Sequence, residues 1–116
     1  MEFKGIRKSK NKNKKYDAIF YDKENNKTKG VSFGQAGASD YTVHKDEIRR
    51  NRYISRHWKD LKTNDPMAAG YLSMYILWNK NNLRKSVLDY KRRYNIYLKS
   101  GTFPLKIDNM PNNLLK

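Results

Sequence analysis

The sequence contains no cysteine, which excludes disulfides, thiolate nucleophiles and cysteine-based metal sites and is compatible with a reducing compartment. It also has no long hydrophobic run: the longest, over residues 67–78, is too short to span a bilayer. The first ten residues show none of the apolar stretch that a secretory signal requires. We therefore expect a protein that is neither secreted nor bound to a membrane.

Acidic residues are scarce as well. The chain has 11 Asp and Glu against 26 Lys and Arg, which makes a formal net charge of +15. A charge of this size favours anionic partners, namely nucleic acid, an acidic membrane surface or an acidic protein, and nucleic acid is the commonest match for a small basic domain. With 116 residues, of which 13% are aromatic, the chain is long enough for one domain with a modest core.

Residues that carry catalysis are few. The two histidines, His44 and His57, show no zinc-site spacing, and no nucleotide-binding glycine motif is present. The best enzymatic alternative is a metal-dependent nuclease in which His44, Asp46 and Glu47 hold magnesium. The two acids are better interpreted as residues that favour a helix N-terminus. We therefore expect a protein that is not an enzyme and that uses no cofactor, metal or small-molecule substrate.

The order of apolar and polar residues predicts an α+β fold, in which an N-terminal β-hairpin or small antiparallel sheet precedes three helices. Strands are expected over residues 3–7, 16–21 and 28–33, and helices over residues 43–61, 67–78 and 83–99. We expect a basic strand and arm over residues 1–15, one domain over 16–101 and an extended tail over 102–116. The lysine–asparagine run at 8–15 has no apolar residue, which predicts a mobile loop.

A row of five cations marks the predicted helix over residues 43–61. They follow one another at spacings of four, three, four and three, which keeps them on one helical face: Lys45, Arg49, Arg52, Arg56 and Lys59. The opposite side is expected to pack on the core through Val43, Ile54, Trp58 and Leu61. The next predicted helix, over 67–78, is apolar nearly all round, which predicts burial that extends into a homodimer interface.

We interpret the five cations as contacts to the phosphate backbone of nucleic acid, with double-stranded DNA favoured and little dependence on base sequence. Arginine supplies forked donors that suit phosphate. The row has no interleaved Asn or Gln, the side chains that read base edges. The lysine run and the third helix would extend the surface through Lys10, Lys12, Lys14, Lys15, Lys85, Arg92 and Lys99.

A series of short motifs lies between residues 33 and 80. It comprises Phe33, Gly34, Gly37, Ser39, Asp40, Tyr41, Thr42, His44, Lys45, Asp46, Arg49, Tyr53, Arg56, His57, Ala69, Gly70, Leu77, Trp78, Asn79 and Lys80. The series resembles a family of small basic proteins of giant DNA viruses, catalogued as a domain of unknown function. The resemblance implies a viral protein, located in the virion or in the viral factory or nucleus of an infected cell. It implies no reaction, and an alternative role is a structural protein that neutralises an acidic partner or a packaged genome.

Overall fold

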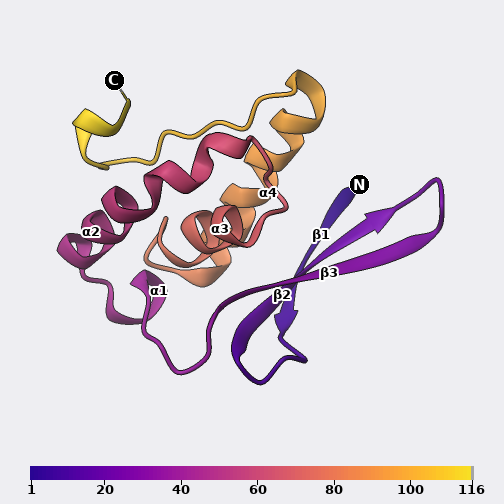
Figure 1. The fold of residues 1–116 in the computed structure, drawn as a ribbon, viewed down its shortest axis with the longest axis horizontal. Coiled ribbons are helices and arrows are strands. Elements are labelled where there is room, and N and C mark those ends of the chain that lie inside the picture. Colours follow the sequence, from indigo (N-terminus) through magenta and orange to yellow (C-terminus); the bar gives the residue numbers. More distant parts are fainter. Residues whose placement is uncertain (116) are drawn as a thin grey trace.

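In a computed structural model, which describes residues 1–115, the chain has the expected α+β fold, with an antiparallel sheet followed by helices (Figure 1). Lys116, the end of the predicted tail, lies outside the described residues. The strands pair in the order of the chain and are β1 (Glu2–Lys8), β2 (Lys14–Asp22) and β3 (Lys27–Gln35). Their alternation places Phe3, Phe20 and Phe33 on one buried face, each 3% exposed or less.

The helical part covers this face of the sheet. It consists of α1 (Tyr41–His44), α2 (Glu47–His57), the 3₁₀ segment η1 (Trp58–Thr63), α3 (Ala69–Leu72), the π-helical segment η2 (Ser73–Leu77), α4 (Leu83–Ser100) and the 3₁₀ turn η3 (Asn112–Leu115). The predicted third helix is confirmed as α4. It starts where the Asn82 side chain accepts a hydrogen bond from Lys85 N at 3.0 Å, and it ends at Gly101, whose φ is +81°.

The prediction of one continuous helix over residues 43–61 is wrong. Lys45 adopts a left-handed conformation with φ of 57°, which ends α1. The carboxylate of Asp46 then accepts hydrogen bonds from Ile48 N at 3.0 Å and Arg49 N at 3.2 Å, which starts α2. The break also turns Val43 outward, where it is 65% exposed, so this residue does not pack on the core as expected.

The apolar segment predicted as a helix over 67–78 is buried, although its regular part begins only at Ala69. Tyr71, Leu72 and residues 74–77 are each 3% exposed or less. They pack against β3 and α4 within the same chain. The apolar surface from which a homodimer was expected is therefore covered within one chain, and the homodimer stays a prediction without that support.

The tail is part of the fold. It runs from the end of α4 back across the molecule toward α2 (Figure 1). Phe103 and Ile107 are 1% and 0% exposed, and the ring centroid of Phe103 lies 4.9 Å from that of Tyr75. Tyr75 Oη donates a hydrogen bond to the backbone oxygen of Leu105 at 2.7 Å. The tail thus closes the core from the side opposite the sheet.

Candidate nucleic-acid interface

The structure gathers three of the five predicted cations on α2. Arg49, Arg52 and Arg56 are exposed and lie three and four residues apart, so they share one side of the helix, while Ile54 on the other side is fully buried. Among the described residues, none of the three arginines forms an ion pair with a carboxylate. We call these three residues the arginine ridge. Their charge remains available for an anionic ligand.

The other two predicted members of the row lie off this ridge. Lys45 precedes α2, and its Nζ donates a hydrogen bond to the backbone oxygen of Asn81 at 2.5 Å. Lys59 lies in η1, beyond the end of α2, and is exposed. The break at Lys45 and the tighter 3₁₀ winding of η1 change the angle between successive side chains, so the predicted spacing does not hold over the whole row.

The lysine run at residues 8–15 forms the turn between β1 and β2, in which Ser9 N donates a hydrogen bond to Lys15 O at 3.0 Å, so it is part of the sheet and not a separate arm. Lys8 ends β1, and β2 begins at Lys14. The turn lines a hollow with a volume of about 500 Å³, whose cations are Lys8, Lys10, Lys12, Lys14 and Lys15. We call it the lysine hollow. No carboxylate lines it, so it concentrates positive charge at one end of the sheet.

Asp17 fixes the shape of this turn from the neighbouring strand. Its carboxylate accepts hydrogen bonds from Ser32 Oγ and Ser9 Oγ, both at 2.6 Å, and from Lys10 N at 3.3 Å. These hydrogen bonds, first that of Ser32 and then that of Ser9, lower the pKa of Asp17 to about 2. The ionised carboxylate therefore holds the lysine-bearing turn against β3.

Lys15 differs from the other lysines of the hollow. Its Nζ forms an ion pair with the carboxylate of Asp40, and the two side chains are 15% and 3% exposed. Asp40 also accepts a hydrogen bond from Thr42 N at 2.9 Å, which caps α1. Lys15 thus joins β2 to the start of the helical part, so its predicted role as a free phosphate contact is not supported.

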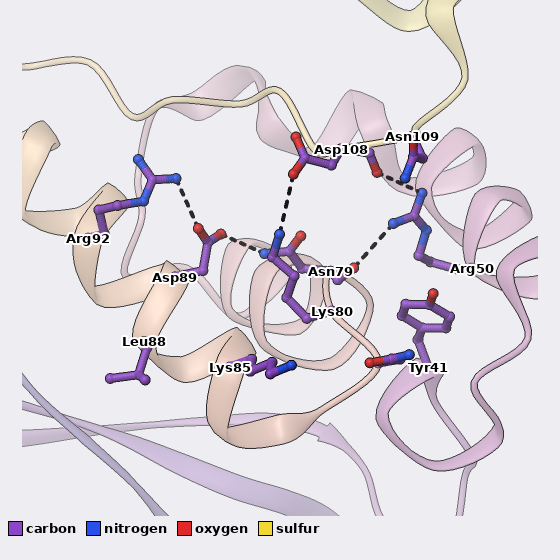
Figure 2. A pocket seen from close by; sticks show the side chains of 11 residues that line it. Tyr41, Arg50, Asn79, Lys80, Lys85, Leu88, Asp89, Arg92, Asp108 and Asn109 are labelled. Atoms are coloured by element: carbon purple, nitrogen blue, oxygen red, sulfur yellow. Dashed lines mark hydrogen bonds and ion pairs between the residues drawn. The ribbon is translucent and has the colours of Figure 1, made fainter.

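The three predicted cations of α4 differ in whether a carboxylate neutralises them. Lys85 and Lys99 are exposed, whereas Arg92 Nη2 lies 2.9 Å from the Asp89 carboxylate. Lys85 and Arg92 line a cleft with a volume of about 650 Å³, which Figure 2 shows between α4, the Tyr41 side chain and the tail. Two carboxylates, Asp89 and Asp108, share this cleft with four cations, so part of its positive charge is compensated within the chain.

Two arginines have a structural role that the sequence pattern did not reveal. Arg50 is 4% exposed and donates hydrogen bonds to the backbone oxygens of Asn79, at 3.2 Å, and of Asp108, at 3.0 Å (Figure 2). Arg93 is also 4% exposed, and its Nε lies 2.6 Å from the Asp89 carboxylate. The available signal was the Asp89–Arg93 spacing of four on α4. Arg50 has the same spacing to Asp46, but Asp46 caps α2 and Arg50 instead bonds Asn51, Asn79 and Asp108.

Burial raises the pKa of the Asp89 carboxyl, but the hydrogen bonds from Arg93 and Arg92 outweigh this effect and keep the pKa below its usual value. Asp89 therefore stays ionised. It also accepts a hydrogen bond from Asn79 Nδ2 at 2.7 Å. These contacts tie α4 to the segment before it and leave Asp89 little capacity for an external ligand.

The residues of the nuclease alternative have local partners. His44 Nδ1 accepts a hydrogen bond from Asp46 N at 2.9 Å, and burial lowers the pKa of His44. Asp46 caps α2, and Glu47 is exposed in the first turn of that helix. Among residues 1–115, no three His, Asp or Glu side chains gather as a metal-ligand group. The arrangement favours the interpretation as a helix start.

A pocket of about 370 Å³ lies beside the arginine ridge, and we call it the aromatic pocket. It is bordered by the loop over residues 34–40 and by Tyr53, His57 and Trp78, with Lys15 and Arg56 at its edge. Lys15 also lines the lysine hollow. Arg56 also lines a groove of about 620 Å³ on the other side of α2, which reaches Pro111 of the tail. The shared residues make these three hollows neighbours on the surface.

Comparison with known proteins adds one result. The model of a family described as "Family of unknown function (DUF5754)" matches residues 5–57. Comparison with curated proteins and with solved structures gave no match. Within residues 1–115, no helix has the length and apolar character needed to cross a membrane. The matched region contains the sheet except the first three residues of β1, together with α1 and α2, and thus the lysine hollow and the arginine ridge. Over residues 5–57, then, this chain is similar to a family of unknown function.

Proposed function

We propose that this protein binds nucleic acid, and DNA in particular, through the phosphate backbone and with little preference for base sequence. The observation that carries the proposal is the exposed arginine ridge, which has no carboxylate partner among the described residues and is separated from the lysine hollow by the aromatic pocket, which both border. In a chain with a net charge of +15, the three ridge arginines and the hollow's Lys8, Lys10, Lys12 and Lys14 are among the cations without a carboxylate partner in the described residues. Such a surface gains affinity by releasing the counterions of a polyanion.

The dimensions of the ridge suit a nucleic-acid strand. Arg49 and Arg56 are seven residues apart, which is about 10 Å along an α-helix. One strand of DNA advances about 3.4 Å per nucleotide, so the ridge matches about three successive phosphates. With the cations of the lysine hollow added, the complete surface would contact about six phosphates. A salt dependence with a slope of log K against log salt near −5 is therefore expected.

The decisive experiment is a fluorescence anisotropy titration of a labelled duplex across a salt series. Replacing the ridge by Arg49→Gln, Arg52→Gln and Arg56→Gln together should weaken binding at least tenfold on duplexes of any sequence. It should also reduce the magnitude of the salt slope by about 3. The reason is that three phosphate contacts are lost while the buried side of α2 is unchanged.

The matched control removes the same charge elsewhere. Lys23, Lys27 and Lys29 are exposed near the β2–β3 turn, at the other end of the hairpin from the lysine hollow. Replacing all three by glutamine lowers the net charge by the same amount and should weaken binding much less. If both triple variants lost the same affinity, binding would follow net charge alone, and the ridge would be rejected as the binding face.

The resemblance to small basic proteins of giant DNA viruses supports a viral setting for this proposal. The polyanion would then be the viral genome, at its site of replication or in the virion. An acidic protein is the competing partner. Polyglutamate added at matched salt should displace the duplex only at concentrations far above those of competitor DNA, because a flexible polypeptide lacks the phosphate geometry that forked arginine donors fit.

A further inference from the structure

We propose that the aromatic pocket binds one unpaired nucleobase, so that the surface made by this pocket, the lysine hollow and the arginine ridge binds a single strand, or an unpaired stretch of a duplex, more tightly than a perfect duplex. The inference rests on the proposed function and specifies the form of nucleic acid that fits. It concerns the surface between the lysine hollow and the arginine ridge, since Lys15 and Arg56 both border this pocket.

Four rings form a row that ends in the pocket. Tyr53 stacks on Trp78, with centroids 4.3 Å apart and planes at 5°, and His57 lies on the other face of Tyr53, also at 4.3 Å. The second neighbour of Trp78 is His44, at 5.4 Å. Both inner rings are thus covered, whereas the His57 side chain is 42% exposed. His57 is therefore the ring on which a further planar group can stack.

The histidine ring is held in place for such stacking. Its Nδ1 lies 3.1 Å from Asp60 Oδ2, one turn further along the chain. Tyr53 supports the inner face of the ring, and burial raises the pKa of Tyr53 to about 12, so this support stays neutral. A fixed platform loses little conformational entropy when a base stacks on it. Stacking on aromatic side chains is the usual way in which single strands are bound without sequence preference.

The opposite wall of the pocket is also fixed. Gly34 has a φ of +78°, and a Cβ atom at this position would lie 2.9 Å from Leu77 Cδ1, so the end of β3 passes directly over the core. After Gly34, Gln35 and Ser39 border the pocket, and their exposed polar side chains can form hydrogen bonds with the edge of a base. The neighbouring Arg56 is placed to contact the phosphate of the same nucleotide.

The test compares a single strand with a duplex of the same sequence. A thymidine 12-mer that carries one 2-aminopurine should show quenched fluorescence when the wild-type protein binds, because a stacked 2-aminopurine is quenched. His57→Ala should weaken binding of this strand about tenfold and remove part of the quenching. It should change duplex affinity less than twofold. His57→Phe should restore single-strand binding, since it returns a flat ring without the charge of a protonated histidine.

The outcomes separate the two proposals. If His57→Ala weakened single strand and duplex equally, or if His57→Phe failed to restore single-strand binding, the base pocket would be refuted while backbone binding remained. If the wild-type protein bound neither probe at low salt, the proposed function itself would be refuted. An RNA 12-mer measured in parallel tests whether the protein contacts the sugar. Equal affinity for the RNA and DNA strands indicates contacts to base and phosphate only. Far-UV circular dichroism of each variant checks that the exposed substitution leaves the fold intact.

Discussion

Arg50 Nη2 donates a hydrogen bond to the backbone oxygen of Asp108 at 3.0 Å, which ties α2 to the tail across 58 residues of sequence. The same guanidinium lies over the ring of Tyr41, with Cζ 5.3 Å from the centroid. The preceding residue, Arg49, is exposed and unpaired among the described residues. These two adjacent arginines thus have different roles. Arg50 connects α2 to the tail, and Arg49 faces the solvent.

Replacing Arg50 by alanine should lower the free energy of unfolding by about 2–4 kcal/mol, because the buried carbonyl oxygen of Asn79 and the partly buried one of Asp108 lose a charged donor. Replacing Arg49 by alanine should change it by less than about 0.5 kcal/mol, as is usual for an exposed side chain. Urea denaturation of both variants measures the difference. Equal destabilisation by the two changes would show that Arg50 does not bridge α2 and the tail in solution.

Gly34→Ala should destabilise the protein by about 2–3 kcal/mol. The new methyl group would meet Leu77 Cδ1 at 2.9 Å and Lys15 Cβ at 3.3 Å, in a backbone conformation that alanine disfavours. Gly37→Ala is the matched control: its φ is +83°, but nothing lies within 4 Å of the added atom, so about 1 kcal/mol is expected. Thermal denaturation that gave the two variants the same midpoint would contradict the close approach at Gly34.

Phe103→Ala should lower the free energy of unfolding by about 3–5 kcal/mol, although Phe103 lies in the tail after α4. Its side chain is 1% exposed and lies edge-on to Tyr71 and Tyr75, so its removal leaves a cavity in the core. Leu98→Ala, at a position that is 49% exposed, should cost less than about 1 kcal/mol. A Phe103→Ala protein as stable as the wild type would show that the tail is detached in solution.

Stability should fall in acid in a way that depends on Asp17. Its pKa is about 2 in the folded protein, below the value of about 3.9 expected in the unfolded chain. The resulting stabilisation is complete above pH 4 and is lost as the pH falls toward 2, to the extent of about 1–2 kcal/mol. Urea midpoints between pH 5 and pH 2.5 should therefore decline more steeply for the wild type than for Asp17→Asn. Parallel declines would assign the acid sensitivity to other carboxylates.

Spacing alone sufficed to predict the strands, the helix α4 with its Gly101 end, the burial of the apolar middle segment and the strongly basic character of the chain. These features depend on neighbours a few residues apart, whose side chains the backbone period places on one face. The same reasoning identified Arg49, Arg52 and Arg56 as one exposed row, because all three lie within the single helix α2.

Only the tertiary structure decided which cations are free. The partners of Arg50 and Lys15 lie 58 and 25 residues away, so no local pattern indicates that the first is buried and the second is neutralised by Asp40. The break at Lys45 and the shape of the lysine turn likewise depend on capping and on contacts between strands. The aromatic pocket exists because the end of β3 passes over Leu77, far along the chain. The periodicity of apolar residues determined which side of each helix and strand is apolar. Contacts between residues far apart in the sequence determined what each side packs against.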